Sequence, residues 1–326
     1  MKHFTCYTFA PWDMPFWTAL MAAYPRHARW IHEADGLLRV IDYRHGLHYR
    51  TAFKKPRALK LLLDGAALLV WNGSTPEYDA ALAHARARKM TPIFMENGFG
   101  IAGKVQIDRA GVNAASSFAR LPIEAIRTFP ALTMPLTFTQ PPAPDDAGEE
   151  PALPDRFVFL PLQIEDDTQI EQHAPLRWRR MERVIQAVKT GLPKGYKLVM
   201  KEHPGAPTDP ELRACFPTVT WLRFMPIAKI LPAAALVVTV NSNVGVQAIA
   251  AGLPVVTLGD AIYSRPELVT CAPEAGSLRG ALQAALDALP DADLRARWLV
   301  ALFCGCLCNA DPASILARVE ALEVGA

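Results

Sequence analysis

Residues 237–259, VVTVNSNVGVQAIAAGLPVVTLG, place a polar Asn-Ser pair between an apolar segment and a run of small residues. If a strand ends at Asn241 and Ser242 and a helix begins there, that helix directs free N–H groups and its positive dipole end toward the strand end. Such an arrangement binds phosphate. Gly245 leaves room for a ligand or a neighbouring strand to approach. Taken alone, the stretch is explained equally well by a helix cap followed by turns.

A second polar cluster ends the segment KLVMKEHP at 197–204. The strands of a parallel sheet end on one side, so Lys201 and His203 are expected at the same edge as Ser242. A lysine and a histidine there can stabilise the charge of a departing phosphate without giving up a proton. The alternative is a solvated strand end with a capping histidine.

A third cluster lies in LPLQIEDDTQI at 160–170, where Gln163, Asp167 and Gln169 occupy alternate positions after an apolar run. Amides and a carboxylate with this spacing can bind sugar or ribose hydroxyls, which both donate and accept hydrogen bonds. The spacing is also typical of an ordinary polar loop.

Two carboxylates stand in the first half of the chain. FMENGFG places Glu96 and Asn97 before two glycines, and VQIDRAGVNAASS follows with Asp108 and Asn113. Two carboxylates on loops at one site are the minimum for acid/base or nucleophilic chemistry at a sugar carbon, with the two asparagines as sugar-binding neighbours. The alternative is that Glu96 caps a turn and Asp108 opens one.

The elements that must position these groups alternate along the chain. Short apolar strands separated by helices indicate parallel sheets covered on both faces. The Pro-rich acidic stretch at 140–155 is the expected linker. The predicted fold is therefore α/β, with two Rossmann-like domains at 1–150 and 151–326 facing a cleft. Strands are predicted at 67–73, 91–98, 156–163, 196–204, 218–222, 235–242 and 254–258, and helices at 76–90, 175–190, 243–251, 276–288, 291–307 and 311–322.

Composition narrows the class of protein. A chain of 326 residues that is 51% hydrophobic can build two cores. The net charge of +2, from 34 basic and 32 acidic residues, argues against nucleic acid as a partner. Six cysteines without framework spacing predict a reducing compartment. With no secretory signal pattern and no run of about 20 apolar residues, we expect a cytoplasmic protein that does not cross a membrane.

Taken together, the motifs resemble the bacterial capsular polysaccharide synthesis proteins that are retaining β-Kdo transferases. ENGF, VQIDRAGVNAASS, LPLQIEDDTQI, KEHP and NSNVGVQAIAAGLPVVTLGDAIY occur in the family's order within residues 67–263. The likeness is greatest to the single-module type that adds the first Kdo to lyso-phosphatidylglycerol. The resemblance implies the two-domain GT-B arrangement, CMP-Kdo as donor, a lipid or glycolipid acceptor, and no cofactor or metal in the transfer.

The resemblance also implies roles for individual residues. It makes Asp108 the nucleophile and Glu96 the base that receives the acceptor proton, an order that can be exchanged, and front-face attack is the alternative route to retention. Gln247 stands where the family usually has Glu, and it can still bind a ribose hydroxyl. The nucleotide-sugar would contact Lys201, His203, Asn241, Ser242, Gly245 and Gln247, and the cleft would be lined by Asn97, Asn113, Gln163, Asp167 and Gln169.

Two other functions remain open at this point. One is a sugar-nucleotide epimerase of similar architecture, and the other is a non-catalytic nucleotide- or polysaccharide-binding protein of capsule assembly. The cysteines of FCGCLCN at 303–309 are interpreted as core positions, because their alternate spacing does not suit zinc. The basic stretch at 50–60 is interpreted as a solvated face, with contact to anionic lipid headgroups near a lipid acceptor as the alternative. For the protein as a whole, peripheral contact with the inner membrane and with other capsule assembly proteins is expected.

Overall fold

The computed structural model describes residues 4–8, 19–20, 23, 28–34, 37–42, 53–54, 63, 65–139, 148–274, 278–288 and 290–324. Two compact units share the chain. Unit 1 comprises 1–98, 103–120 and 303–326, and unit 2 comprises 99–102 and 121–302.

Unit 1 is built on a sheet whose described strands follow the order β14-β7-β6-β5-β1-β2-β3-β4. Strands β6, β5, β1 and β2 are parallel, whereas β7, β14, β3 and β4 run antiparallel to their neighbours. The strands are β1 (Phe4–Thr8), β2 (Ala28–Ala34), β3 (Leu37–Asp42), β4 (Phe53–Lys54), β5 (Ala67–Trp71), β6 (Thr91–Asn97), β7 (Lys104–Asp108) and β14 (Leu307–Asn309).

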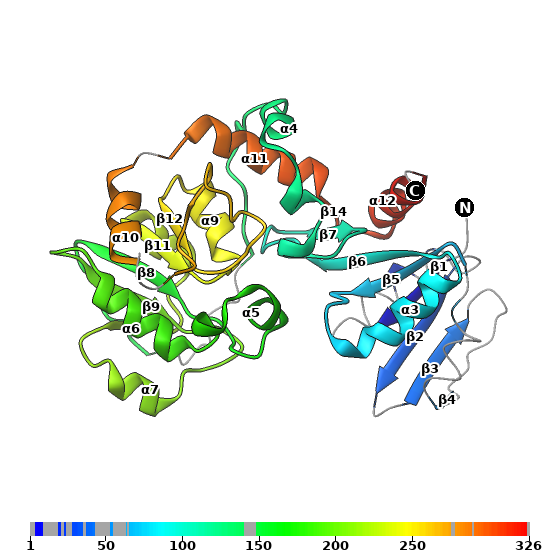
Figure 1. Ribbon diagram of the computed structural model, residues 1–326, viewed down its shortest axis with the longest axis horizontal. Helices are drawn as coiled ribbons and strands as arrows, with labels where there is room; N and C mark the ends of the chain where they lie inside the picture. The colour runs from blue at the N-terminus through cyan, green and yellow to red at the C-terminus, as the bar shows by residue number, and fades with distance from the viewer. Residues whose placement is uncertain are drawn as a thin grey trace. The chain divides into compact units, whose positions relative to one another are not determined.

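Two of the described helices lie beside this sheet (Figure 1), and each contributes side chains to a separate apolar cluster. Helix α12 (Pro312–Val324) contributes Ile315 and Val319 to a cluster that contains Met95 of β6. Helix α3 (Asp79–Ala87), which follows a 3-10 turn at Pro76–Tyr78, contributes Leu82 to the other cluster, together with Phe94 of β6. Successive residues of β6 therefore enter different cores, as the alternation of side chains along a strand requires.

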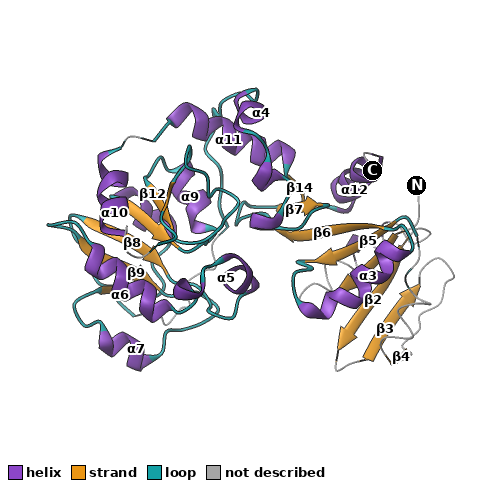
Figure 2. Ribbon diagram, in the orientation of Figure 1, coloured by secondary structure: helices purple, strands orange, loops and turns teal. Residues whose placement is uncertain are grey.

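Unit 2 contains a fully parallel sheet, whose described strands follow the order β10-β9-β8-β11-β12-β13. Figure 2 shows the strands that it labels, β8, β9 and β12, among the helices of the same unit. Its strands are β8 (Phe157–Pro161), β9 (Lys197–Lys201), β10 (Thr220–Leu222), β11 (Leu236–Thr239), β12 (Val255–Thr257) and β13 (Thr270–Cys271). Its helices are α4 (Ile123–Arg127), α5 (Thr168–His173), α6 (Met181–Gly191), α7 (Pro210–Cys215), α8 (Ile227–Ile230), α9 (Val244–Ala250) and α10 (Leu278–Asp287), and α11 (Ala292–Gly305) runs on into unit 1.

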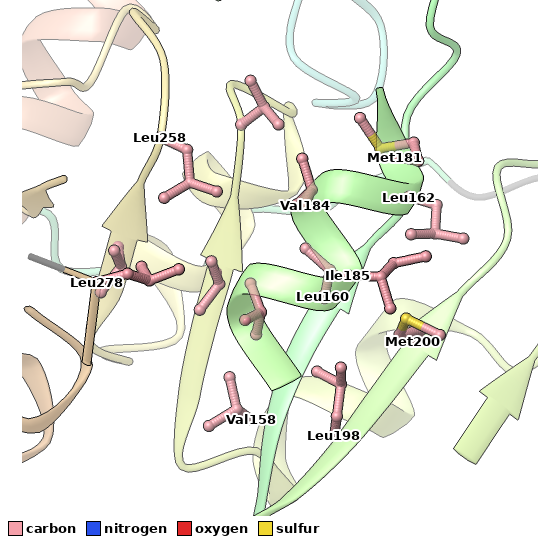
Figure 3. Packing of buried hydrophobic residues seen from close by; sticks show 14 of the residues in the cluster. Val158, Leu160, Leu162, Met181, Val184, Ile185, Leu198, Met200, Leu258 and Leu278 are labelled. Carbon is pink, nitrogen blue, oxygen red and sulfur yellow. The ribbon is translucent and has the colours of Figure 1, made fainter. Parts of the chain in front are cut away.

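The core of unit 2 follows from the pattern of helix α6. Its buried residues Met181, Val184, Ile185 and Val188 recur every three or four positions and form one apolar stripe. Figure 3 shows this helix lying over the buried side chains of β8 and β9. This packing holds the strands in register, so that β8, β9 and β11 present their carboxyl ends along one edge.

The predicted strands and helices that fall on described residues are present, most with ends that differ by a few residues. The predicted helix at 175–190 is divided into a 3-10 turn at Leu176–Trp178 and helix α6, which begins at Met181. The predicted α/β class, with two units built on largely parallel sheets, is confirmed as well. The antiparallel strands β7 and β14 were not predicted. The basic stretch at 50–60 lies outside the described residues, apart from the backbone of β4.

The units do not coincide with the predicted boundary between 150 and 151. Residues 303–326 belong to unit 1 because β14 pairs with β7 and α12 packs on both strands. Residues 121–150 belong to unit 2, where the N–H of Leu132 donates to the carbonyl of Ala296 at 3.2 Å and Arg297 donates to the carbonyl of Phe129 at 2.6 Å. Both differences arise from contacts between segments far apart in the chain, which a local pattern does not reveal.

Candidate functional site

At the carboxyl edge of the unit 2 sheet, the side-chain amides of Gln163 and Asn241 bind each other. Nε2 of Gln163 donates to Oδ1 of Asn241 at 2.9 Å, while Oε1 of Gln163 accepts the N–H of Asn241 at 3.1 Å and the hydroxyl of Thr239 at 3.2 Å. Nδ2 of Asn241 donates to the carbonyl of Gln169 at 2.8 Å. The structure brings these predicted residues together as partners of one another, and their amides fix the turn after β11.

The same turn explains why residue 245 is a glycine. The hydroxyl of Tyr263 donates to the carbonyl of Ser242 at 2.5 Å, and a Cβ on Gly245 would stand only 2.1 Å from the Tyr263 ring. Tyr263 is 1% exposed, and this burial raises its pKa. The group that approaches Gly245 closely is therefore this ring. Ser242 itself is half-buried, and its Oγ accepts the N–H of Val244 at 3.2 Å.

Lys201, the last residue of β9, is buried with 8% exposure. Its ammonium donates to the carbonyl of Arg223. Burial lowers the pKa of Lys201, and the carboxylates of Glu150 and Glu202 oppose that shift. The positive charge of Lys201 is thus compensated within the unit, so any stabilisation of a phosphate by this residue acts at a distance.

Glu150, at the end of the acidic linker, is held by backbone N–H groups. Its carboxylate accepts from three consecutive residues, Arg223 at 3.0 Å, Phe224, and Met225 at 3.3 Å. Successive backbone donors around one carboxylate form an anion-binding nest. The linker is therefore fastened just beyond β10, by a residue that was not among those predicted.

His203 is exposed, and its Nδ1 accepts the N–H of Gly205 at 3.1 Å. Partial desolvation lowers the pKa of His203, the charge of Asp167 opposes this, and Lys201 adds to it. A neutral imidazole that accepts at Nδ1 carries its proton on Nε2. His203 can therefore donate a hydrogen bond to a ligand through Nε2.

A cavity of ≈ 510 Å³ opens beside His203 and Gln163, at the carboxyl ends of β8 and β9. Carboxylates dominate its charged lining, with Arg180 as a basic neighbour. Such a lining suits groups that donate hydrogen bonds, such as sugar hydroxyls or an amino group, better than it suits a phosphate. The acidic residues that line the cavity are Glu165, Asp166, Glu182, Asp209 and Glu211.

The remaining predicted residues of unit 2 have structural partners. Asp167 caps α5, because its Oδ1 accepts the N–H of Gln169 at 2.7 Å. Nε2 of Gln169 is buried and makes no hydrogen bond within the described part of the chain. The amide nitrogen of Gln247 lies 3.7 Å from where a Cβ on Gly100 would stand, so this side chain lies against the 99–102 segment of unit 2.

In unit 1, Glu96 and Asp108 lie on adjacent strands. Phe94 pairs with Asp108 and Glu96 pairs with Gln106 in the antiparallel register of β6 and β7. Residues directly opposite in such a pair share a face, so the two carboxylates are diagonal neighbours, which in antiparallel pairs lie about 7–8 Å apart. The structure therefore places both predicted carboxylates on one face of the sheet.

The surroundings of the two carboxylates differ. Asp108 is 2% exposed, and it accepts the N–H of Ala110 at 2.7 Å and both the N–H and the hydroxyl of Ser117, at 3.0 and 2.6 Å. Glu96 is half-buried, and its Oε1 accepts the N–H of Asn97 at 2.8 Å. Asp108 organises the loop from 109 to 117, whereas Glu96 keeps a face toward solvent.

The two predicted asparagines lie near these carboxylates. Asn97 is exposed at the end of β6. Asn113 adopts a left-handed φ of 51°, and its N–H donates to Oε1 of Gln106 at 3.0 Å. Oδ1 of Asn113 is buried and makes no hydrogen bond among the described residues.

The described residues contain no group of three His, Cys, Asp or Glu side chains that could hold a metal ion. Cys306 is buried and Cys308 half-buried, while Cys304 is exposed. Burial raises the pKa of Cys306 to about 12 and that of Cys308 to about 11. In the described part of the chain, no helix has the length and apolar character to span a bilayer.

Sequence reasoning missed several residues that shape these sites. Thr239 and Tyr263 hold the turn after β11, Glu150 fastens the linker, and the amide of Asn72 contacts Glu96. Tyr263 lies within the motif region, but nothing in the sequence pairs it with Gly245. Glu150 offered no signal, because its partners are backbone groups more than 70 residues away.

Two solved structures share the fold of this chain. Thermosulfurimonas dismutans KpsC, in a structure described as a β-Kdo 2,7 transferase, superposes with a TM-score of 0.53 over 98% of this chain and 99% of that chain, at 17% identity. A KpsC structure described as a β-Kdo 2,4 transferase gives a TM-score of 0.53 over 98% of both chains, at 13% identity. The chain thus has the two-unit α/β fold of these proteins, as the sequence resemblance implied.

The chain belongs to the family of capsule polysaccharide biosynthesis proteins, which it matches over residues 143–306. Protein FixF of Sinorhizobium fredii (strain NBRC 101917 / NGR234) is 29% identical over 249 residues, which cover 72% of this chain and 58% of FixF. The chain therefore spans less than two thirds of that relative's length. The match to the family includes the whole carboxyl edge of the unit 2 sheet.

Proposed function

We propose that this protein is a glycosyltransferase of capsule polysaccharide biosynthesis that transfers Kdo from CMP-Kdo to a lipid or glycolipid acceptor, with retention. The observation that carries this proposal is the family match over 143–306, because that segment contains the strand ends at Gln163, His203 and Ser242. The likeness of fold to KpsC supports it.

Unit 2 has the chemistry to hold the nucleotide part of the donor. The proton on Nε2 of His203 can bond to the departing phosphate, and the dipole of the turn at Ser242 adds to its stabilisation. The carboxylate-lined cavity beside Gln163 suits the hydroxyl and amino groups of the nucleoside. The fixed amides of Gln163 and Asn241 keep this edge in one geometry, which reduces the cost of reorganisation during the reaction.

Unit 1 supplies the carboxylates of the proposed reaction. The bond between the anomeric carbon and the phosphate oxygen breaks, CMP leaves, a bond to the acceptor oxygen forms, and the acceptor proton passes to Glu96. In double displacement Asp108 would first bond to the anomeric carbon, which requires release of Ser117 from its carboxylate. Front-face attack leaves those hydrogen bonds in place, and the burial of Asp108 therefore favours this route.

The acceptor belongs to the same proposal. Lyso-phosphatidylglycerol, or Kdo already attached to it, offers the hydroxyl that attacks the sugar. A lipid acceptor implies work at the inner face of the cytoplasmic membrane, in peripheral contact with it and with other capsule assembly proteins. The transfer as proposed uses no cofactor and no metal ion.

The test is incubation of the protein with CMP-Kdo generated in situ and a fluorescent lyso-phosphatidylglycerol, followed by mass spectrometry, with Glu96→Gln alongside. A product heavier by one Kdo, absent with the variant, supports the proposal. Thermal shifts with CMP and with UDP separate it from an epimerase that uses a nucleoside diphosphate sugar. Stabilisation by UDP alone, without Kdo transfer, would overturn it.

A further inference from the structure

We infer that Asn72 is a positioning residue for Glu96, an assignment that rests on the proposed role of Glu96 as the base. Nδ2 of Asn72 donates to Oε2 of Glu96 at 3.0 Å. Asn72 directly follows β5, and Glu96 stands near the end of the neighbouring parallel strand β6. The contact therefore joins two strand ends at the carboxyl edge of the unit 1 sheet.

A hydrogen bond to the side-chain oxygen of Asn72 fixes the orientation of its amide. Oδ1 of Asn72 accepts the N–H of Ser74 at 3.0 Å, so the oxygen faces the turn and the nitrogen must face Glu96. The N–H of Asn72 donates to the carbonyl of Met95 at 2.7 Å, which ties the residue to the strand that carries Glu96. An asparagine can do both, because its amide carries an acceptor and a donor at opposite ends.

The backbone around Asn72 adds to this placement. Asn72 has a φ of 57° and Gly73 a φ of 75°, a left-handed pair that asparagine and glycine tolerate best. A Cβ on Gly73 would lie 2.6 Å from the ring of Phe94, so the turn packs directly on β6 two residues before Glu96. The turn is therefore packed against the strand that carries the carboxylate.

Both carboxylate oxygens of Glu96 accept a hydrogen bond from a neighbouring residue. Its Oε1 accepts the N–H of Asn97 and its Oε2 accepts from Asn72. Each oxygen of the carboxylate therefore accepts from a donor on its own side, and this restricts the group to one orientation at the end of β6. Held in this way, the carboxylate of Glu96 has the fixed orientation that the proposed general base needs.

The test uses Asn72→Asp and Asn72→Gly in the full chain. The aspartate keeps the size and the acceptor for Ser74 but sets a second carboxylate against Glu96, and the glycine keeps the left-handed backbone but removes the amide. We expect a loss of Kdo transfer of about 10- to 100-fold for both, since displaced reacting groups lose rate on this scale. For Asn72→Asp, the acid limb of the pH–rate profile should move up by about one pH unit or more, because like charges oppose ionisation.

The matched control is Asn309→Asp, which makes the same charge change at the exposed end of β14, beside Lys104.

A second readout does not depend on activity. Titration of Glu96 by carboxyl-carbon NMR, with the signal assigned from Glu96→Gln, should show a higher midpoint in Asn72→Asp and an unchanged one in Asn309→Asp. An unchanged midpoint in Asn72→Asp would overturn the inference, as would a loss of rate that merely follows a loss of folded protein. If the wild-type chain transfers no Kdo while the NMR midpoint still moves, the contact stands and the proposed function fails.

Discussion

Replacing Gly245 with alanine tests whether this glycine serves the packing of Tyr263 or the approach of a ligand. The added Cβ would stand 2.1 Å from the ring, whereas ordinary contact begins at 3.4 Å, so the ring must move by about 1.3 Å. That movement breaks the buried hydrogen bond to Ser242, which costs about 1–3 kcal/mol, and overpacking costs about 1–3 kcal/mol more. Alanine regains about 1 kcal/mol of helix propensity. The free energy of unfolding should therefore fall by about 1–5 kcal/mol.

Urea unfolding of the ligand-free protein measures this change. Gly280→Ala is the matched control, because Gly280 lies in helix α10 with no heavy atom within 4 Å of its Cβ position. That variant should gain about 0.5–1 kcal/mol. If Gly245→Ala proves as stable as the wild type without ligand, the clash with Tyr263 is not the reason for this glycine.

Three further predictions concern the carboxylates and a histidine. Glu96→Gln should lower Kdo transfer by about 10²–10⁴-fold. Asp108→Asn should lower the free energy of unfolding by about 1–3 kcal/mol, because an amide cannot accept all of the present donors of this buried group. Glu96→Gln should lose less stability, because Glu96 is half-buried and water can replace a lost partner, and equal losses in the two variants would contradict this. Glu150→Gln should cost about 1 kcal/mol in urea unfolding, because its three N–H donors lose a charged acceptor; no loss of stability would show that the nest holds no charge-dependent contact. Burial lowers the pKa of His173 below its usual value of 6.5, and the charge of Asp260 opposes this shift. Just below pH 6.5 the unfolded chain therefore binds more protons than the folded chain, so the free energy of unfolding should fall as the pH decreases through this window. His173→Gln should flatten that part of the slope between about pH 5 and 7, and an unchanged slope would assign it to other groups.

The parts of the fold that depend on local pattern could be predicted. The apolar runs that became β5, β6, β8 and β11 are long enough to identify as strands, and their alternation with helices predicted parallel pairing. Strand β14 could not be found in this way, because it has three residues and pairs with β7 some 200 positions earlier. The same pairing places residues 303–326 in unit 1, whereas the sequence pattern had assigned them to the second domain.

The site was predictable in its residues but not in their partners. A parallel sheet brings Gln163 and Asn241 to one edge whatever their rotamers, so their proximity followed from topology. Their mutual hydrogen bonds depend on side-chain geometry, which residue type and spacing do not determine. Likewise, a glycine after a strand end signals close approach, but only the structure identifies Tyr263 as the group that approaches.

The pairing of β14 with β7 has a consequence for how this protein is made. A ribosome releases the chain from its N-terminus, and domains generally fold in that order. Unit 1 cannot complete its sheet until residues 303–326 have been synthesised, whereas every residue of unit 2 has been made by position 302. During translation, the first part of the chain must therefore wait for the last, with the edge of β7 unpaired while unit 2 is already able to fold.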